Sequence, residues 1–382
     1  MRDRLRSSSA RWDRIVAVAF VAVLILPGIA LVAGVRPPDL ENSANVPIPK
    51  LDAAALADPE TYKAIEDHVA RDLPGRNVAL GVYATLDYEL LRGSTDPQVV
   101  VGRDDWLFFR GELQPVCPVG AAELMRQLDD VANRAKQAGI RVRFAIAPDK
   151  HTIYPDRLLP DPPMPIPCTD AMRSEVRAGM AARPDVSVDL WTVVEAERNA
   201  APADAPPLYF TQDSHWTPTT AMPAIGALVE SLAPGVWDPA EITVDGTTRF
   251  PMELARLMGK PRNANVPRYI VRPTVTVEHS VVPVPFELKN ARDIGVYTTD
   301  PAAKVVPGTT LVVYDSFFNI NRARVVPWFE RTIWIHAGDL RDHPEVADLL
   351  PRIDTIVLAR VERGAYEMDI AQLLRPILER GR

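Results

Sequence analysis

Thr309-Thr-Leu-Val-Val-Tyr-Asp-Ser-Phe317 is an apolar run that stops at an acidic residue and a serine. Runs rich in β-branched residues are typical of strands, and two more follow at 331–336 and 354–360. Helical patterns near 344–350 and 367–380 separate or follow these strands. Strands that alternate with helices predict an α/β fold, with a mostly parallel sheet and helices on both faces.

The same alternation extends back along the chain to residue 98. We expect two short strands around a Gly-Arg-Asp-Asp turn within 98–109, and an apolar strand at 140–147. The other expected elements are a strand at 186–190 and helices at 121–138, 170–182, 191–198 and 218–232. Residues 235–300 have little helical period and are interpreted as an insertion with a small sheet. The main domain is therefore expected to span 98–382.

Tyr209-Phe-Thr-Gln-Asp-Ser-His-Trp-Thr-Pro218 places an acid and an imidazole two residues apart. In nucleophilic catalysis a carboxylate holds one ring nitrogen of a histidine, and the other nitrogen is then free to take a hydroxyl proton. Asp213 and His215 are candidates for such a pair. The non-catalytic alternatives are a structural role for His215 and, for Asp213, capping of the helix that begins near Thr217.

Ser316 is the candidate hydroxyl for this pair. It directly follows an apolar strand and precedes an expected turn into helix, a placement that resembles the nucleophile turns of serine hydrolases. A serine that merely caps a helix is commoner, so the serine alone would indicate little. The Asp213-x-His215 pair elsewhere in the chain is what favours catalysis.

Further candidates lie near the ends of the expected strands, where active sites of open α/β sheets form. Lys150, Glu362 and Arg363 stand at or just past such ends. An oxyanion needs hydrogen-bond donors near the nucleophile, and Asn319, Asn321 and Arg322 follow Ser316 closely enough to be considered. Each of these three is also a common kind of turn or surface residue. Trp216 is expected in the core or in the wall of the site.

The N-terminal region predicts a membrane anchor. Residues 15–35 carry no charge and are long enough to span a bilayer as a helix. Five arginines precede them within residues 1–14, so this tail is expected in the cytoplasm and the body outside it. A cleaved signal peptide is the alternative, although Leu31 occupies a position where cleavage sites have a small residue. Residues 36–97 are expected to form a Pro-rich stalk and a helical collar.

The charge of the chain argues against non-specific binding of nucleic acid. The total is −7, and residues 1–14 have five arginines against two aspartates. The remainder is therefore net −10, a poor match for a phosphate backbone. The two cysteines, Cys117 and Cys168, are expected to form a disulfide in an exported chain, with two unpaired thiols as the alternative. No Cys/His cluster has zinc spacing, so no metal is expected.

Four sequence motifs occur in a fixed order along the chain, and a fifth, Val-Glu-Arg, follows at 361–363. The ordered set is more specific than any one of the motifs. The four are Val-Val-Val-Gly-Arg-Asp-Asp-Trp-Leu-Phe-Phe at 99–109, Ala-Pro-Asp-Lys-His-Thr-Ile-Tyr-Pro-Asp-Arg-Leu-Leu-Pro at 147–160, Gln-Asp-Ser-His-Trp-Thr-Pro at 212–218 and Tyr-Asp-Ser-Phe at 314–317. With these motifs the chain resembles the AlgX/AlgJ family of alginate O-acetyltransferase-like proteins. The resemblance implies an SGNH-hydrolase-like, flavodoxin-like domain.

The resemblance also implies roles for individual residues. In that family the Asp and His precede the Ser, and this chain has the same order. Ser316 would be the nucleophile, His215 the base and Asp213 its orienting acid. Tyr314 stands where many relatives have a glycine that helps to shape the oxyanion hole. The implied reaction is a two-step acyl transfer that needs no cofactor.

The implied acceptor is a hydroxyl of a cell-surface or exported polysaccharide. The resemblance also implies a partner of the anchored, periplasmic domain, a membrane-bound O-acyltransferase that supplies the acetyl donor. Two rival functions remain open. An acetyl-glycan esterase would use the same three residues with water as acceptor, and a membrane-tethered glycan-binding or assembly protein would use none of them.

Overall fold

The computed structural model describes residues 2–35, 55–113, 120–159, 169–202, 204–300 and 302–380. The chain divides into two compact units. The first unit comprises residues 1–97 and 255–262, and the second comprises residues 98–254 and 263–382. Cys117 and Cys168 lie outside the described residues, so the disulfide stays a prediction.

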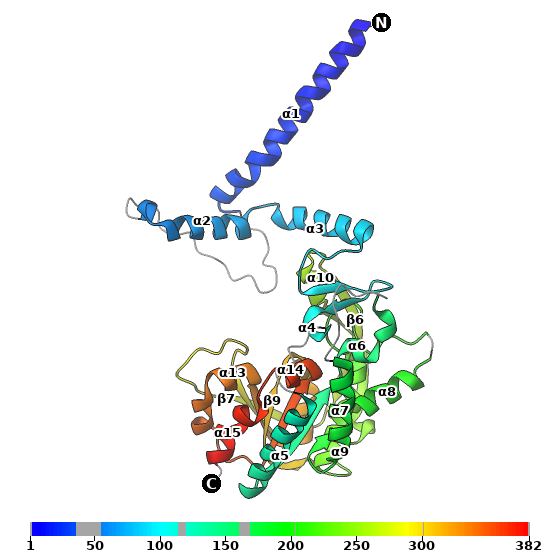
Figure 1. Ribbon diagram of the computed structural model, residues 1–382, viewed down its shortest axis with the longest axis vertical. Coiled ribbons are helices and arrows are strands. Elements are labelled where there is room, and N and C mark those ends of the chain that lie inside the picture. The colour runs from blue at the N-terminus through cyan, green and yellow to red at the C-terminus, as the bar shows by residue number, and fades with distance from the viewer. Residues whose placement is uncertain are drawn as a thin grey trace. The chain divides into compact units, whose positions relative to one another are not determined.

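The first unit is helical. Its elements are α1 (Arg2–Val32), α2 (Pro59–Asp72), α3 (Arg76–Leu86) and the π-helix η2 (Asp87–Leu91). Within α1, Arg14–Val32 is long and apolar enough to cross a membrane (Figure 1). This helix coincides with most of the apolar stretch at 15–35 and makes α1 a candidate membrane anchor.

A second segment of the chain, residues 255–262, completes this unit. Lys260 Nζ lies 3.2 Å from a carboxylate oxygen of Glu89 and 4.1 Å from the centre of the Tyr88 ring. Thr95 Oγ1 donates a hydrogen bond of 3.0 Å to the carbonyl of Met258. Residues 255–262 fall inside the insertion expected at 235–300, so their packing against residues 88–95 is a tertiary feature that no local pattern indicates.

The second unit is built on a seven-stranded sheet in the order β4-β3-β11-β9-β10-β8-β7. Five neighbouring strands from β4 to β10 are parallel, and β8 is antiparallel to both of its neighbours. The strands are β3 (Arg141–Ala147), β4 (Ser187–Val188), β7 (Val277–Val282), β8 (Ile294–Thr299), β9 (Val306–Tyr314), β10 (Phe329–His336) and β11 (Thr355–Val361). The predicted α/β fold with a mostly parallel sheet is therefore confirmed.

Helices cover both faces of this sheet, and the central strands are therefore buried on both sides. On one face α5 (Ala121–Gln137), α7 (Thr169–Ala181) and α15 (Ile370–Arg380) pack on side chains such as Phe144 and Leu358. On the other, α9 (Pro218–Leu232) and much of α8 (Leu190–Ala200) pack on the alternate side chains. Figure 1 shows α5 and α15 side by side.

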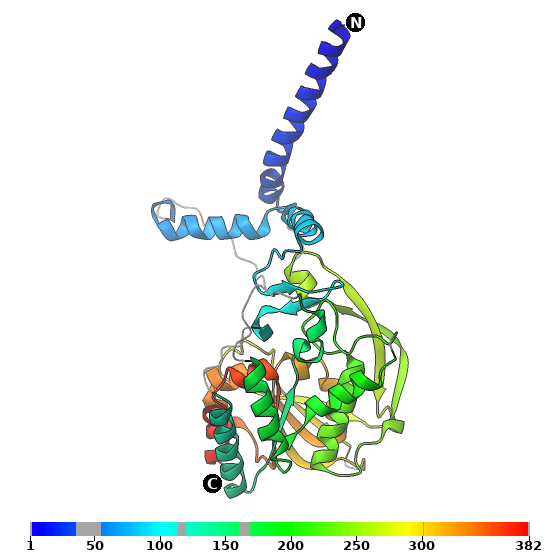
Figure 2. The ribbon, with the colours of Figure 1, turned by 45° about the vertical axis from the view of Figure 1, so that its right-hand side comes forward.

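Two small antiparallel pairs flank the main sheet. β1 (Val99–Val101) and β2 (Leu107–Phe109) form the expected hairpin, whose turn places Asp104 and Asp105 at positive φ, a conformation that aspartate tolerates better than most residues. β5 (Ile242–Pro251) and β6 (Asn263–Val271) pair only with each other, in the yellow-green ribbon of Figure 2. The small sheet expected within 235–300 is thus limited to β5 and β6, because β7 and β8 extend the main sheet.

Short helices begin directly after the carboxyl ends of four parallel strands. They are α6 (Lys150–Ile153) after β3, α11 (Ser316–Asn319) after β9, α13 (Ala337–Asp342) after β10 and α14 (Glu362–Tyr366) after β11. Other short α-helices among the described residues are α4 (Arg110–Leu113), α10 (Glu253–Leu257) and α12 (Arg322–Val325). Lys150, Ser316 and Glu362 therefore stand at one edge of the sheet, as the sequence analysis expects.

Candidate active site

The loop before α9 is folded back on itself. Tyr209 and Trp216 form an antiparallel bridge, and the N–H of Phe210 donates to the carbonyl of His215 at 3.2 Å. Just outside, the N–H of Thr217 donates to the carbonyl of Leu208 at 2.8 Å. These bonds fix the backbone on both sides of Asp213 and His215, so the two side chains leave a rigid turn.

Asp213 and His215 form a hydrogen-bonded pair. His215 Nδ1 lies 2.7 Å from Asp213 Oδ1, and the same oxygen accepts the backbone N–H of His215 at 2.9 Å. Both side chains are buried. Because Asp213 is an acceptor, the proton sits on Nδ1 and the Nε2 lone pair is free. Among the described residues, none hydrogen-bonds to Nε2.

The pair also sets the charge of its two members. Burial opposes ionisation of both groups, but the hydrogen bond and the charge of Asp213 raise the pKa of His215 above its ordinary value. Burial likewise acts to raise the pKa of Asp213, and the contact with His215 together with two backbone N–H donors outweighs it and lowers that pKa. The arrangement therefore favours a carboxylate beside a basic imidazole.

Ser316 lies at the carboxyl end of β9 and is the first residue of α11, with its side chain exposed. Asp315 fixes this turn, because its two carboxylate oxygens accept the N–H of Phe317 at 3.0 Å and the N–H of Val361 at 2.7 Å. The second bond ties the turn to the end of β11. The oxygen acceptors of Asp315 thus hold the backbone that presents Ser316 above the sheet.

The histidine loop and the serine turn meet through their next residues. Trp216 Nε1 donates to the carbonyl of Phe317 at 3.0 Å, across 101 positions of sequence. The rings of His215 and Phe317 have centres 5.0 Å apart. Trp216 is fully buried, so its indole belongs to the core that joins the two segments. The candidate acid and base thus lie against Phe317, the residue that directly follows the candidate hydroxyl.

Glu253 also contacts the Asp213 loop, and no sequence pattern predicts this contact. Its N–H donates to Asp213 Oδ2 at 2.7 Å, and its carboxylate accepts the hydroxyl of Ser214 at 2.7 Å. No sequence motif surrounds Glu253. It is the first residue of α10, which follows the long strand β5. Asp213, His215 and Glu253 each offer a metal-ligating atom within 4.8 Å of the others. A metal there would have to displace the Nδ1 proton that Asp213 accepts.

Lys150 has a different task from the expected contact with substrate. The side chain is completely buried, and its ammonium donates to three backbone carbonyls, those of Leu107, Thr211 and Asp213. The last two bonds are 2.9 and 3.0 Å long. Burial lowers the pKa of Lys150 to about 7, and the negative charges of Glu112 and Asp213 oppose that effect. Lys150 therefore fastens the Asp213 loop to the β2 strand.

We expect Lys150→Met to lower the free energy of unfolding by about 3 kcal/mol, because buried carbonyls lose their donors while the apolar volume is kept. The change would be measured by urea unfolding of the full chain in detergent. Lys136→Met is the matched control, since Lys136 is exposed on α5, and should shift the value by no more than about 0.5 kcal/mol. Equal stability of the two variants would contradict the role assigned to Lys150.

Glu362 and Arg363 are also held by buried partners. Arg363 pairs with Asp149, and its guanidinium lies 5.2 Å from the centre of the Phe317 ring. Burial acts to lower the pKa of Arg363, but Asp149 and other carboxylates outweigh it and raise that pKa. Glu362 accepts hydrogen bonds from Arg173 at 2.6 Å and from Tyr366 at 3.0 Å. Arg363 thus places a positive charge beside the serine turn, whereas Glu362 belongs to the supporting network.

Arg322 binds two of the other candidates near Ser316, Tyr314 and Asn319. Arg322 donates to the hydroxyls of Tyr314 and Tyr297 at 2.9 and 3.2 Å, and also to Asn319 Oδ1. Tyr314 is buried, and Asn321 is buried with its amide donating to the carbonyl of Phe317 at 3.2 Å. Asn319 is exposed, as Ser316 is. Asn321 therefore holds the carbonyl of Phe317 in the serine turn, whereas Tyr314 is a partner of Arg322.

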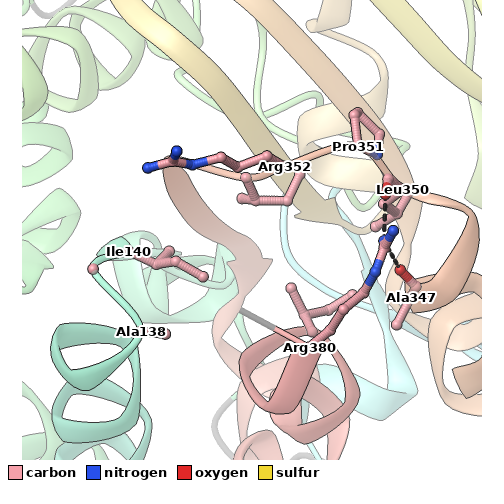
Figure 3. A pocket seen from close by; sticks show the side chains of 10 residues that line it. Ala138, Ile140, Ala347, Leu350, Pro351, Arg352 and Arg380 are labelled. Carbon is pink, nitrogen blue, oxygen red and sulfur yellow. Dashed lines mark hydrogen bonds between the residues drawn. The ribbon is translucent and has the colours of Figure 1, made fainter. Parts of the chain in front are cut away.

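A cavity of about 480 Å³ lies at the opposite edge of the sheet (Figure 3). Its walls include Ile140 and Ile353, which precede β3 and β11, and Arg380, which donates to the carbonyls of Ala347 and Leu350. Because these residues stand at the amino ends of the strands, the cavity cannot serve His215 and Ser316 at the carboxyl ends.

Comparison with known proteins finds similarity in the part of the chain that contains the Asp213 loop. Residues 99–279 match the family model described as SGNH hydrolase-like domain, acetyltransferase AlgX. A probable alginate O-acetylase AlgJ of Pseudomonas putida is 28% identical over 175 residues, which are 45% of this chain and 43% of that protein. The AlgJ of Pseudomonas aeruginosa is 28% identical over 185 residues, 46% and 44% of the two chains. The chain thus matches less than half of the length of these relatives.

Solved structures of similar proteins include the O-acetyltransferase domain of Pseudomonas putida AlgJ, with a TM-score of 0.45 at 19% identity over 72% of this chain and 99% of that one. Bacillus cereus PatB1 gives a TM-score of 0.48 at 14% identity, over 72% and 98% of the two chains. The family model covers the Asp213 loop, and the resemblance drawn from the ordered motifs is confirmed: residues 99–279 match the SGNH hydrolase-like domain of acetyltransferase AlgX.

Proposed function

We propose that this protein is an extracytoplasmic O-acetyltransferase that transfers an acetyl group onto hydroxyls of a polysaccharide. The observation that carries the proposal is the Asp213–His215 pair, with a proton on Nδ1 and a free Nε2, joined to the serine turn by the bond from Trp216 to Phe317. A carboxylate, an imidazole and a hydroxyl in these relations are the working parts of nucleophilic acyl transfer. Relatives named alginate O-acetylase support the same reaction.

In the first step His215 Nε2 takes the proton of Ser316 Oγ while the oxygen attacks the carbonyl carbon of an acetyl ester or thioester. The tetrahedral intermediate collapses, the donor's leaving group departs with the proton from Nε2, and an acetyl ester remains on Ser316. Asp213 keeps its proton-accepting contact with Nδ1 and stabilises the imidazolium between the two transfers. Arg363 supplies positive charge near the developing oxyanion.

In the second step His215 takes a proton from a sugar hydroxyl, whose oxygen attacks the acetyl ester. The new sugar ester leaves, and Ser316 Oγ recovers its proton from Nε2. Water in place of the sugar would make the protein an esterase, and the exposure of Ser316 leaves that route open. The order of events is the same in both cases, so only the acceptor separates them.

We place the catalytic unit outside the cytoplasm, anchored by α1 with its arginine-rich end inside. The acetyl donor is supplied at the membrane by a membrane-bound O-acyltransferase. The acceptor is an exported polysaccharide, for which alginate is the first choice because the relatives carry that name. A cofactor has no part in either step.

The test uses the full chain in detergent with a chromogenic acetyl ester as donor and alginate oligosaccharides as acceptor. A neutral gluco-oligosaccharide serves as the matched acceptor, and mass spectrometry follows both sugars and the intact protein. Acetylated alginate together with an acetyl group on the Ser316 peptide is the expected result. Free acetate alone would assign the esterase instead, and an unconsumed donor would refute both enzymes in favour of a binding protein.

A further inference from the structure

The Nδ1 side of His215 faces three oxygen atoms that belong to different residues. Asp213 Oδ1 is 2.7 Å away, Ser214 Oγ is 3.4 Å away and Glu253 Oε2 is 3.7 Å away. Only the first lies at the distance of a strong hydrogen bond. The other two form a second layer, because the Ser214 hydroxyl donates to Glu253 at 2.7 Å.

The direction of the Ser214 hydroxyl proton determines how Ser214 and Glu253 act on the imidazole. A hydroxyl has one proton, and that proton is directed at Glu253. Toward His215, Ser214 therefore presents only lone pairs, as Asp213 and Glu253 do. Three acceptors around one ring nitrogen favour the Nδ1–H tautomer and leave the lone pair on Nε2, which is the form that a general base needs.

Glu253 acts on the pair a second time through its backbone. Its N–H donates to Asp213 Oδ2 at 2.7 Å, so one residue restrains the orienting acid and faces the imidazole. The Glu253 side chain is 38% exposed, and its carboxylate is thus held at the edge of the site and not in the core. Arg363 also acts on His215, because its cation disfavours protonation of the ring.

We propose that Glu253 is a positioning residue, which together with Ser214 fixes the tautomer of His215 and stabilises the imidazolium formed during acyl transfer. The proposal rests on the catalytic role given to His215 above. It assigns the site two carboxylates, one that bonds directly to the ring and one that acts through a serine and through its charge. The charge of Glu253 adds to that of Asp213 in raising the pKa of His215 against the effect of burial.

The test is Glu253→Gln, which keeps the shape and the backbone donor and removes the charge. We expect kcat/KM near neutral pH to fall about three- to tenfold, because a weaker base transfers protons less effectively while Asp213 is still in place. The acid limb of the pH profile should move to lower pH, since loss of a negative charge disfavours the protonated ring. An NMR titration of His215 in the resting protein should shift in the same direction.

Two variants make the result specific. Glu278→Gln removes the same charge from the exposed edge strand β7 and should leave both the rate and the His215 titration unchanged. Ser214→Ala keeps the charge of Glu253 and removes the hydroxyl that holds it, so its titration shift should have the same sign and be smaller. Agreement of both variants with these outcomes would support the two-layer arrangement.

The proposal is overturned if Glu253→Gln leaves the His215 titration where it is in the wild type. A uniform loss of rate without that shift would make Glu253 a structural support of the loop and would equally overturn it. Because the titration is read in the resting protein, the result stands apart from the enzyme assay. A titration shift in a protein that transfers no acetyl group would refute the proposed function and leave the electrostatic role of Glu253 supported.

Discussion

Ser316→Ala is expected to lower the rate of acetyl transfer by about 10⁴-fold or more, because no other group replaces the nucleophile that the imidazole activates. Ser316 is exposed and its side chain is absent from the bonds that fix the turn. The free energy of unfolding should therefore change by no more than about 0.5 kcal/mol. The rate would be measured with the chromogenic ester in single-turnover reactions, and unfolding with urea.

A loss of activity without a loss of stability is the combination that marks a nucleophile. Ser280→Ala offers the control, since Ser280 is an exposed serine on β7, at the edge of the sheet. That variant should match the wild type in both measurements. Retention of more than about a tenth of the wild-type rate in Ser316→Ala would show that acyl transfer does not pass through this hydroxyl.

Asp213→Asn should lower kcat by about 10⁴-fold, the effect expected when the imidazole is held in the wrong tautomer. The two oxygens of Asp213 accept three N–H groups, from His215 Nδ1, His215 N and Glu253 N. An amide has only one oxygen, so its NH₂ group must face an N–H donor whichever way it turns. If the NH₂ faces the ring, the proton moves to Nε2 and the base is lost.

The tautomer is measurable without substrate, from the ¹⁵N chemical shifts of His215 in the wild type and the variant. We also expect Asp213→Asn to lower the free energy of unfolding by about 2 kcal/mol, because a buried donor loses its acceptor. Asp204→Asn, at an exposed position of the preceding loop, is the control for the amide itself. A wild-type kcat with Nε2 still unprotonated would remove Asp213 from the orienting role.

Much of the fold could be predicted because the central strands are buried on both faces. β3, β9, β10 and β11 are near-continuous apolar runs, and each lies within three residues of the range expected for it. The strands at the edge of the sheet are harder to predict from the sequence. In β7 the side chains are exposed or half-buried, and nothing local distinguishes such a strand from one in a separate sheet. Pairing with β8 is decided by tertiary packing.

The candidate site likewise contains residues that the sequence predicts and residues that it does not. Asp213 and His215 are two residues apart, so a local pattern is enough to propose that they meet. Ser316 could be joined to them only through its position after a strand. The three acceptors of Lys150 come from two separate segments, and Glu253 arrives from the end of β5. Neither role has a signal in the sequence, because each depends on which backbone atoms the fold brings together.

The division of the chain into units has a consequence for protein engineering and for inheritance. The backbone passes from one unit to the other after residues 97, 254 and 262. The first unit is thus discontinuous in sequence, because it includes the separate segment 255–262. Removing residues 1–97 would leave this segment without its partners. Lys260 would lose its ion pair with Glu89, and the carbonyl of Met258 would lose its hydrogen bond from Thr95. A chimera that exchanges the N-terminal region must also exchange residues 255–262. The two parts are accordingly expected to descend together and not to shuffle as independent modules.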